Sequence, residues 1–205
     1  MTRRIQMLAG ISLAFVMLAG SYVYGLTGDE AIGQFKKRMH SIGTMSGVIS
    51  WSDPTGMTYS GNFRYRAPGM IYVTFNTPSG KILVSNGKKL WIHDKGSNIC
   101  GVQDLAGGGS GGIASLVNGY AAIVTSQGSS GYTIRLKNRE KTYTDIILML
   151  DGSFMLKKAV LKTAEGSATT YTLSNVRVGD NIVTGIFDYQ VPTNAQVVKN
   201  PLNIR

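Results

Sequence analysis

Alternation of apolar and polar residues is clearest between positions 58 and 93. Tyr59, Phe63 and Tyr65 alternate with polar residues, so a strand here would have one apolar and one polar face. Turn residues then separate three shorter apolar runs. The last two runs flank Asn86-Gly87, which is a strong hairpin signal because both residues tolerate positive φ. The stretch is therefore predicted to form four consecutive antiparallel strands.

Similar patterns predict about seven more strands, joined mostly by tight turns. The others are Met45–Ser52, Ile99–Gln103, Tyr132–Lys137, Thr144–Leu150, Phe154–Lys162, Thr169–Val176 and Ile186–Val191. Neither an internal repeat nor a linker interrupts them. The fold class that follows is mainly β with helices, in one antiparallel meander of about eleven strands.

Two segments have helical periodicity instead. Thr27 and Glu30 have the spacing of a capping box, and apolar residues follow at helical intervals up to Ile42, which predicts a helix over 28–41. A second helix is predicted over Ile113–Thr125, after a glycine-rich loop at 104–112. The periodicity leaves two interpretations open: these helices plug the sheet as ordinary core, or they form a lid over an apolar cavity.

The first 25 residues have the features of a secretory signal peptide. Arg3 and Arg4 precede an apolar run from Ile5 to about Ala19, and small or acceptable residues precede a cleavage site before Leu26. The predicted domains are thus a signal peptide at 1–25 and a single domain at 26–205. An uncleaved N-terminal anchor is the alternative. Either way the domain is exported, and the predicted localisation is the periplasm.

Charge favours anionic partners. The net charge is +10, and removal of Arg3 and Arg4 with the signal peptide leaves +8. The basic residues are dispersed among Ser, Thr and Gly, which is typical of a solvated surface. The run from Phe63 to Arg66 alternates aromatic and basic residues and could stack nucleic-acid bases, but an export signal argues against that partner.

Sequence motifs for catalysis and metal binding are weak. The glycines at 107–112 formally fit a dinucleotide-binding motif, but no acidic residue occurs between Asp104 and Glu140. A nucleophile elbow around Ser110 lacks a histidine after it, because His40 and His93 both precede it. Two histidines and the single Cys100 give no zinc-ligand spacing, and an exported chain with one cysteine has no internal disulfide. We expect no enzyme, no metal and no cofactor.

The central stretch resembles the periplasmic outer-membrane lipoprotein carrier family, or LolA-like proteins. The family has a basic residue, a Pro, an aromatic strand, a Pro-containing turn and a near-constant LVSDGK.LW block. Here these are Arg66, Pro68, residues 70–75, Pro78 and LVSNGKKLW at 83–91, and residues 187–192 are similar to the family's closing strand. The resemblance implies an open, curved antiparallel half-barrel under a helical lid.

The resemblance also implies a function. A LolA-like protein is a monomeric, non-enzymatic periplasmic chaperone that shelters the acyl chains of lipoproteins. It takes them from an inner-membrane ABC transporter and delivers them to an outer-membrane acceptor or to the membrane surface. The alternative is a non-enzymatic lipid-sensing or regulatory module with the same half-barrel.

Candidate site residues follow from the strand faces, the helices and this resemblance. The lipid-binding cavity is predicted to be lined by Trp51, Tyr59, Phe63, Tyr65, Trp91, Leu116, Val117 and Tyr120. The family's basic residue before Pro bonds to the lid, which makes Arg66 the candidate gate, although alternation puts it with Arg64 on the face opposite Phe63. Gly109 and Gly111 are the candidate hinge, because glycine crosses backbone conformations closed to other residues.

Overall fold

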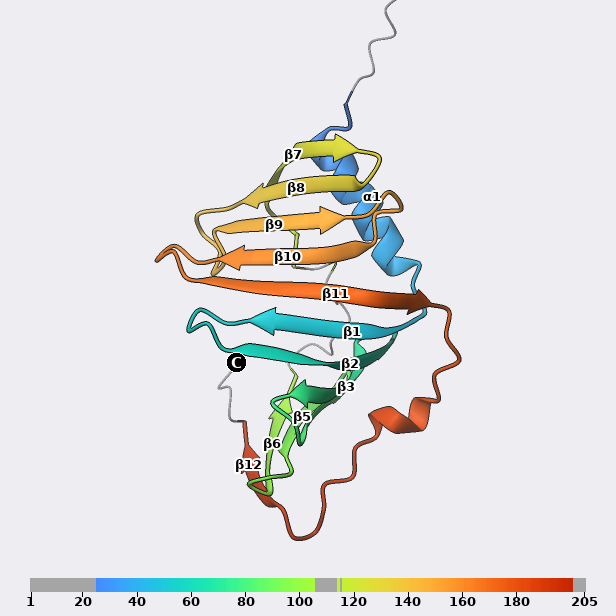
Figure 1. Cartoon of the computed structure of the whole chain (residues 1–205), viewed down its shortest axis with the longest axis vertical. Helices are drawn as coiled ribbons and strands as arrows, with labels where there is room; N and C mark the ends of the chain where they lie inside the picture. The colour runs from blue at the N-terminus through green and yellow to red at the C-terminus, as the bar shows by residue number, and fades with distance from the viewer. Residues whose placement is uncertain (1–24, 106–113, 115, 201–205) are drawn as a thin grey trace, which may run out of the picture.

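A computed structural model describes residues 25–105, 114 and 116–200, and shows one large sheet with one α-helix (Figure 1). The helices are α1 (Gly28–His40) and the 3₁₀ helix η1 (Thr184–Phe187). The strands are β1 (Thr44–Ser52), β2 (Thr58–Arg66), β3 (Met70–Thr77), β4 (Lys81–Asn86), β5 (Lys89–Asp94), β6 (Ile99–Asp104), β7 (Ala121–Gly128), β8 (Gly131–Lys137), β9 (Asp145–Leu150), β10 (Leu156–Lys162), β11 (Ala168–Val178) and β12 (Gln196–Lys199). The predicted fold class, a mainly β open half-barrel with a helical cover, is confirmed.

The sheet consists of two meanders joined at their first and last strands. Its order is β12-β6-β5-β4-β3-β2-β1-β11-β10-β9-β8-β7. The antiparallel pair β1–β11 joins the two halves, with Trp51 opposite Tyr171. Only β12 pairs in parallel, against β6, among the described strands.

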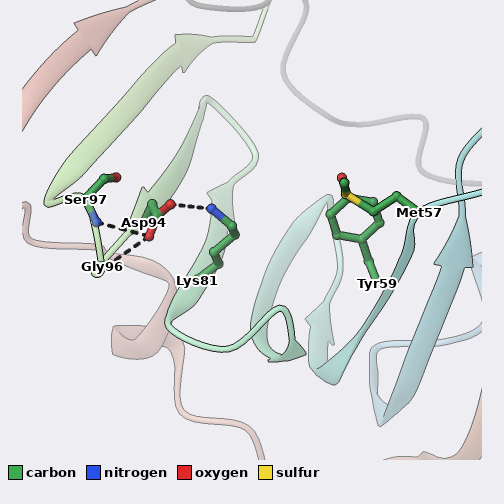
Figure 2. Close-up of polar contacts among 6 residues, drawn as sticks. All are labelled: Met57, Tyr59, Lys81, Asp94, Gly96 and Ser97. Carbon is green, nitrogen blue, oxygen red and sulfur yellow. Dashed lines mark hydrogen bonds and ion pairs between the residues drawn. The ribbon is translucent and has the colours of Figure 1, made fainter. Parts of the chain in front are cut away.

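Asp94 stabilises the open end of the β4–β5 hairpin. Its carboxylate forms an ion pair with Lys81 and accepts a hydrogen bond from the backbone N–H of Gly96 at 3.0 Å (Figure 2).

Helix α1 begins as the sequence predicts and covers the inner face of the sheet at β7 and β8. Glu30 N–H donates to Thr27 Oγ1 at 3.3 Å, while the Thr27 N–H donates to the Glu30 carboxylate at 2.9 Å, so the capping box is complete. Ala31, Ile32 and Phe35 form its buried face. They pack on Ile134, Leu136 and the other inward residues of β8–β10, in the larger of the two inner core clusters.

The outer face of β3–β6 is covered by the chain after β11. Ile82, Val84, Trp91 and Cys100 form a core cluster there, with Tyr189, Val191 and Ala195 of that segment packed against it. The predicted strand Ile186–Val191 is therefore wrong, because these residues contain the end of η1 and then cross the sheet as a cover without joining it. Their apolar side chains are explained by that packing.

The predicted helix Ile113–Thr125 is also wrong from residue 116 onward, although Ala114 is helical. Residues 116–119 form a turn that contains Gly119 at a φ of 76°, and Ala121–Gly128 is the edge strand β7. Burial alternates along β7: Ala122 and Val124 are half-buried, whereas Ile123 is 62% exposed. The run thus has a period of two, and β-branched Ile, Val and Thr suit a strand.

Two predictions fall wholly or mostly outside the described residues: the signal peptide and the glycine hinge. Residues 1–24 and 106–113 are not described. Within the described part, no helix is long and apolar enough to cross a membrane.

Candidate functional site

Four aromatic side chains meet on the inner face of the sheet where its two halves join. Trp51 stacks on Tyr59, with ring centroids 5.0 Å apart and planes at 13°. Phe75 meets the Trp51 ring edge-on at 5.4 Å, and Tyr171 lies 6.3 Å away on the other side. Pairing explains the arrangement, since Tyr59 and Tyr171 are the cross-strand partners of Trp51 on β2 and β11. We call Trp51, Tyr59, Phe75 and Tyr171 the aromatic cluster.

The aromatic cluster is less well covered than the rest of the inner face. Ile134 and Leu136, on the side where α1 packs, are fully buried. Trp51, Tyr59 and Tyr171 are only half-buried, and the Tyr59 hydroxyl donates to Sδ of Met57, which is 55% exposed. Figure 2 shows Met57 and Tyr59 side by side. This arrangement leaves large apolar rings within reach of an apolar ligand.

Phe63 and Tyr65 continue the same face along β2. Phe63 is 3% exposed and belongs to the second inner core cluster with Met45, Val73 and Phe75, while Tyr65 is half-buried against it. The structure therefore brings together the four strand residues that the sequence predicts: Trp51, Tyr59, Phe63 and Tyr65. Phe75 and Tyr171 were missed, although both lie at apolar alternate positions, because only the strand register shows that they face Trp51.

Trp91 does not join this group. It lies on the outer face of β5, 8% exposed, with its ring centroid 6.4 Å from that of Tyr189. Its neighbours are Val84 and Val102 on the flanking strands. The structure thus separates the chain's two tryptophans onto opposite faces of the sheet.

The residues predicted on a second helix have separate environments. Val117 is 3% exposed in the core cluster under α1, and Tyr120 packs against that cluster with its hydroxyl donating to the Tyr143 carbonyl at 2.8 Å. Burial raises the pKa of Tyr120. Leu116 is 53% exposed. None of the three is part of the aromatic cluster, and Gly109 and Gly111 lie outside the described residues.

Arg66 contacts the chain after β11. Its Nη1 donates to the carbonyl oxygen of Ile182 at 2.9 Å, and Ile182 is 5% exposed. Arg66 thus lies on the outer face with Arg64, as alternation predicts, and holds the start of the segment that covers β3–β6. Within the described residues the bond is to this segment and not to α1.

No group of three or more metal-binding side chains occurs among the described residues. Cys100 is fully buried, and burial raises the pKa of its thiol, which keeps it protonated and unreactive. His93 is buried with its Nδ1 on the Tyr189 hydroxyl.

Known proteins resemble this chain in sequence and in fold. The sequence model of the family described as "Outer membrane lipoprotein carrier protein LolA" matches residues 48–190. The chain is 19% identical over 197 residues to an outer-membrane lipoprotein carrier protein of Actinobacillus pleuropneumoniae serotype 3, covering 91% of each chain. It is 20% identical over 142 residues to that of Haemophilus ducreyi, covering 67% of each. Among solved structures, an uncharacterized conserved protein from Thermus thermophilus has a similar fold, with a TM-score of 0.58, 12% identity and coverage of 83% and 98%.

Proposed function

The chain belongs to the outer membrane lipoprotein carrier protein family, and we propose that it is a non-enzymatic periplasmic chaperone that carries lipoproteins from the inner to the outer membrane. The relatives named as carriers support this role. The acyl chains of the cargo would lie on the inner face of β1–β3, against the half-buried rings of Trp51, Tyr59 and Tyr65. The half-burial of Trp51, Tyr59 and Tyr171 in the aromatic cluster is the single observation that carries the proposal.

Physical chemistry favours such a surface for an acyl carrier. Each CH₂ group of a lipid tail costs roughly 0.8 kcal/mol when it is exposed to water, so a multiply acylated protein needs a sheath to cross an aqueous compartment. A carrier must also release its load. Aromatic rings that are only half-buried in the free protein can contact an acyl chain directly. No packed core has to open before the cargo binds. Trp51, Tyr59 and Tyr171 on the inner face have this intermediate burial, whereas the side chains under α1 are fully packed.

The partners of the proposed carrier follow from the route. Cargo would come from an inner-membrane lipoprotein-releasing ABC transporter and pass to an outer-membrane acceptor or directly to the membrane surface. The carrier would work as a monomer after removal of residues 1–25. A lipid-sensing module would instead hold its ligand and bind a protein partner, so reversible exchange of acylated cargo separates the two functions.

The two tryptophans, Trp51 and Trp91, allow a test with a built-in control, because the chain has no others and they lie on opposite faces. Trp91→Phe leaves Trp51 as the only tryptophan, and Trp51→Phe leaves Trp91. An acylated peptide with brominated acyl chains quenches tryptophan fluorescence on contact. We expect the peptide to quench Trp51 strongly and saturably, and Trp91 hardly at all.

Displacement of the brominated peptide by unbrominated peptide completes the experiment. Unbrominated acylated peptide should restore the Trp51 emission, which demonstrates reversible loading. Equal quenching of both tryptophans, or none at either, would contradict an acyl site on the inner face. Quenching of Trp51 that unbrominated peptide fails to reverse would favour the lipid sensor over the carrier.

A further inference from the structure

A polar pocket lies on the outer face of the sheet, remote from the aromatic cluster. It has a volume of about 720 Å³ and is formed where β1, β2 and the end of β11 meet residues 180–182. Eight of its lining side chains are polar or charged: Ser46, Asn62, Arg64, Thr74, Asn175, Arg177, Asp180 and Asn181. The proposed carrier function does not use it, because acyl chains would lie on the other side of the sheet.

Strand register places two arginines on either side of a buried serine. Ser46 on β1 is 6% exposed, and its cross-strand partners are Arg177 on β11 and Arg64 on β2. Adjacent strands are about 4.8 Å apart, so the two arginine backbones are roughly 10 Å apart. This separation lets two guanidinium groups approach one small anion from both sides. Guanidinium forks match the oxygens of carboxylates and phosphates.

The chain itself supplies a carboxylate next to Arg177 and Ser46, that of Asp180. Ser46 Oγ donates to Asp180 Oδ2, and Arg177 Nε donates to the same oxygen at 3.3 Å. The hydrogen bond from Ser46, followed by that from Arg177, lowers the pKa of Asp180 below its usual value. Ser46 and Arg177 thus already bind one oxyanion, the carboxylate of Asp180, as an internal ligand. Arg64 is exposed and makes no hydrogen bond or ion pair within the described part of the chain.

We propose that this pocket is a binding site for a phosphate group, in which Arg64 and Arg177 hold the oxyanion and Asp180 competes with it. Arg64 provides the first contact, because no other described residue binds its guanidinium donors. Asn62 and Asn175 line the same pocket and offer amide donors to the remaining oxygens. The phosphate belongs to a soluble phosphate ester or to a lipid head group, and either class presents the same oxygens to the two arginines.

Three variants test the site, and one matched variant controls for charge. Arg64→Gln and Arg177→Gln each remove one guanidinium from the pocket, and Asp180→Asn removes the competing charge. Arg139→Gln is the control, because it removes an exposed arginine from the β8–β9 connection, which does not line this pocket. The probes are glycerol 3-phosphate, inorganic phosphate, and vesicles of phosphatidylglycerol or phosphatidylcholine, titrated calorimetrically into the exported protein.

We expect the arginine variants to weaken phosphate binding about tenfold, the control to leave it unchanged, and Asp180→Asn to strengthen it several-fold. Binding of the soluble probes identifies a soluble phosphate ester as the ligand. Binding of the vesicles alone identifies a lipid head group. The proposal is overturned if no probe binds, or if Arg139→Gln weakens binding as much as Arg64→Gln. It is also overturned if Asp180→Asn weakens binding, since a neutral polar ligand would use Asp180 as an acceptor. Circular dichroism of each variant confirms that the sheet is intact.

Discussion

Arg66 connects two segments of the chain that lie 116 residues apart. Its side chain leaves the end of β2 on the outer face and donates to the Ile182 carbonyl at 2.9 Å. Ile182 is buried just after β11, and the next residues form η1 and the cover over Trp91. Arg66 therefore fixes the point from which the covering segment starts.

We predict that Arg66→Leu loosens this segment without unfolding the sheet, because it leaves the Ile182 carbonyl without its partner. Amide hydrogen exchange should speed up at residues 182–189 by an order of magnitude or so, and transfer of labelled lipoprotein to outer-membrane vesicles should slow. Arg64→Leu is the control for hydrogen exchange, since Arg64 lies on the same face and makes no such contact. A larger exchange defect at residues 182–189 in Arg64→Leu would show that the wrong arginine is assigned.

The sequence predicts the face on which Arg66 lies but not its partner. Alternation along β2 puts Arg64 and Arg66 on one side and Phe63 and Tyr65 on the other, and the structure agrees. Ile182 lies in an irregular connection, for which no periodicity predicts a position. The outer-face pocket was missed for the same reason, because residues 180–182 complete it.

At the scale of elements, α1 approaches the edge strand β7 very closely. A Cβ added to Gly28 would lie 1.9 Å from the carbonyl oxygen of Ala122, far inside contact distance. Leu26 N–H also donates to the Gln127 side chain at 3.0 Å. Glycine at the first turn of α1 thus lets the helix lie directly on the strand.

Two glycines of α1 give opposite predictions for the same substitution. Gly28→Ala should lower the free energy of unfolding by about 1–3 kcal/mol, because the helix must move away from β7. Gly33→Ala should raise it by about 0.5–1 kcal/mol, since nothing lies within 4 Å of its added Cβ and alanine favours a helix. Urea unfolding of both variants measures the difference. Equal effects of the two substitutions would contradict the close contact with β7.

The elements themselves were predictable to different degrees. The capping box and the Asn-Gly hairpin are local signals, and α1 and β4–β5 follow from them. Strand β7 was predicted as helix because Ile123 and Val124 continue an apolar stripe of helical spacing that begins at Ile113. Its identity as a strand depends on pairing with β8, where Val124 meets Ile134 and Ala122 meets Leu136, and such a contact is not visible in a local pattern.

The whole molecule is a sheet with a different cover on each side. Helix α1 covers part of the inner face, and the segment from η1 to β12 covers the outer face of β3–β6. The sequence predicts strand faces but not which face is inner, so Trp91 was placed with Trp51 although the sheet lies between them. Each tryptophan now reports on one face, and the outer cover can be probed separately from the proposed acyl site.

The last prediction concerns that outer cover. Tyr189 packs its ring against Trp91 and binds the buried His93 through its hydroxyl. Tyr189→Ala should therefore detach the covering segment locally, because it removes the ring and leaves His93 Nδ1 without its partner. In the Trp51→Phe background, acrylamide should quench Trp91 several-fold more efficiently than before the change. In the Trp91→Phe background, quenching of Trp51 should not change, since no part of the cover contacts the aromatic cluster among the described residues. A parallel rise at both tryptophans would mean that the two faces do not open independently and that the segment stabilises the entire sheet.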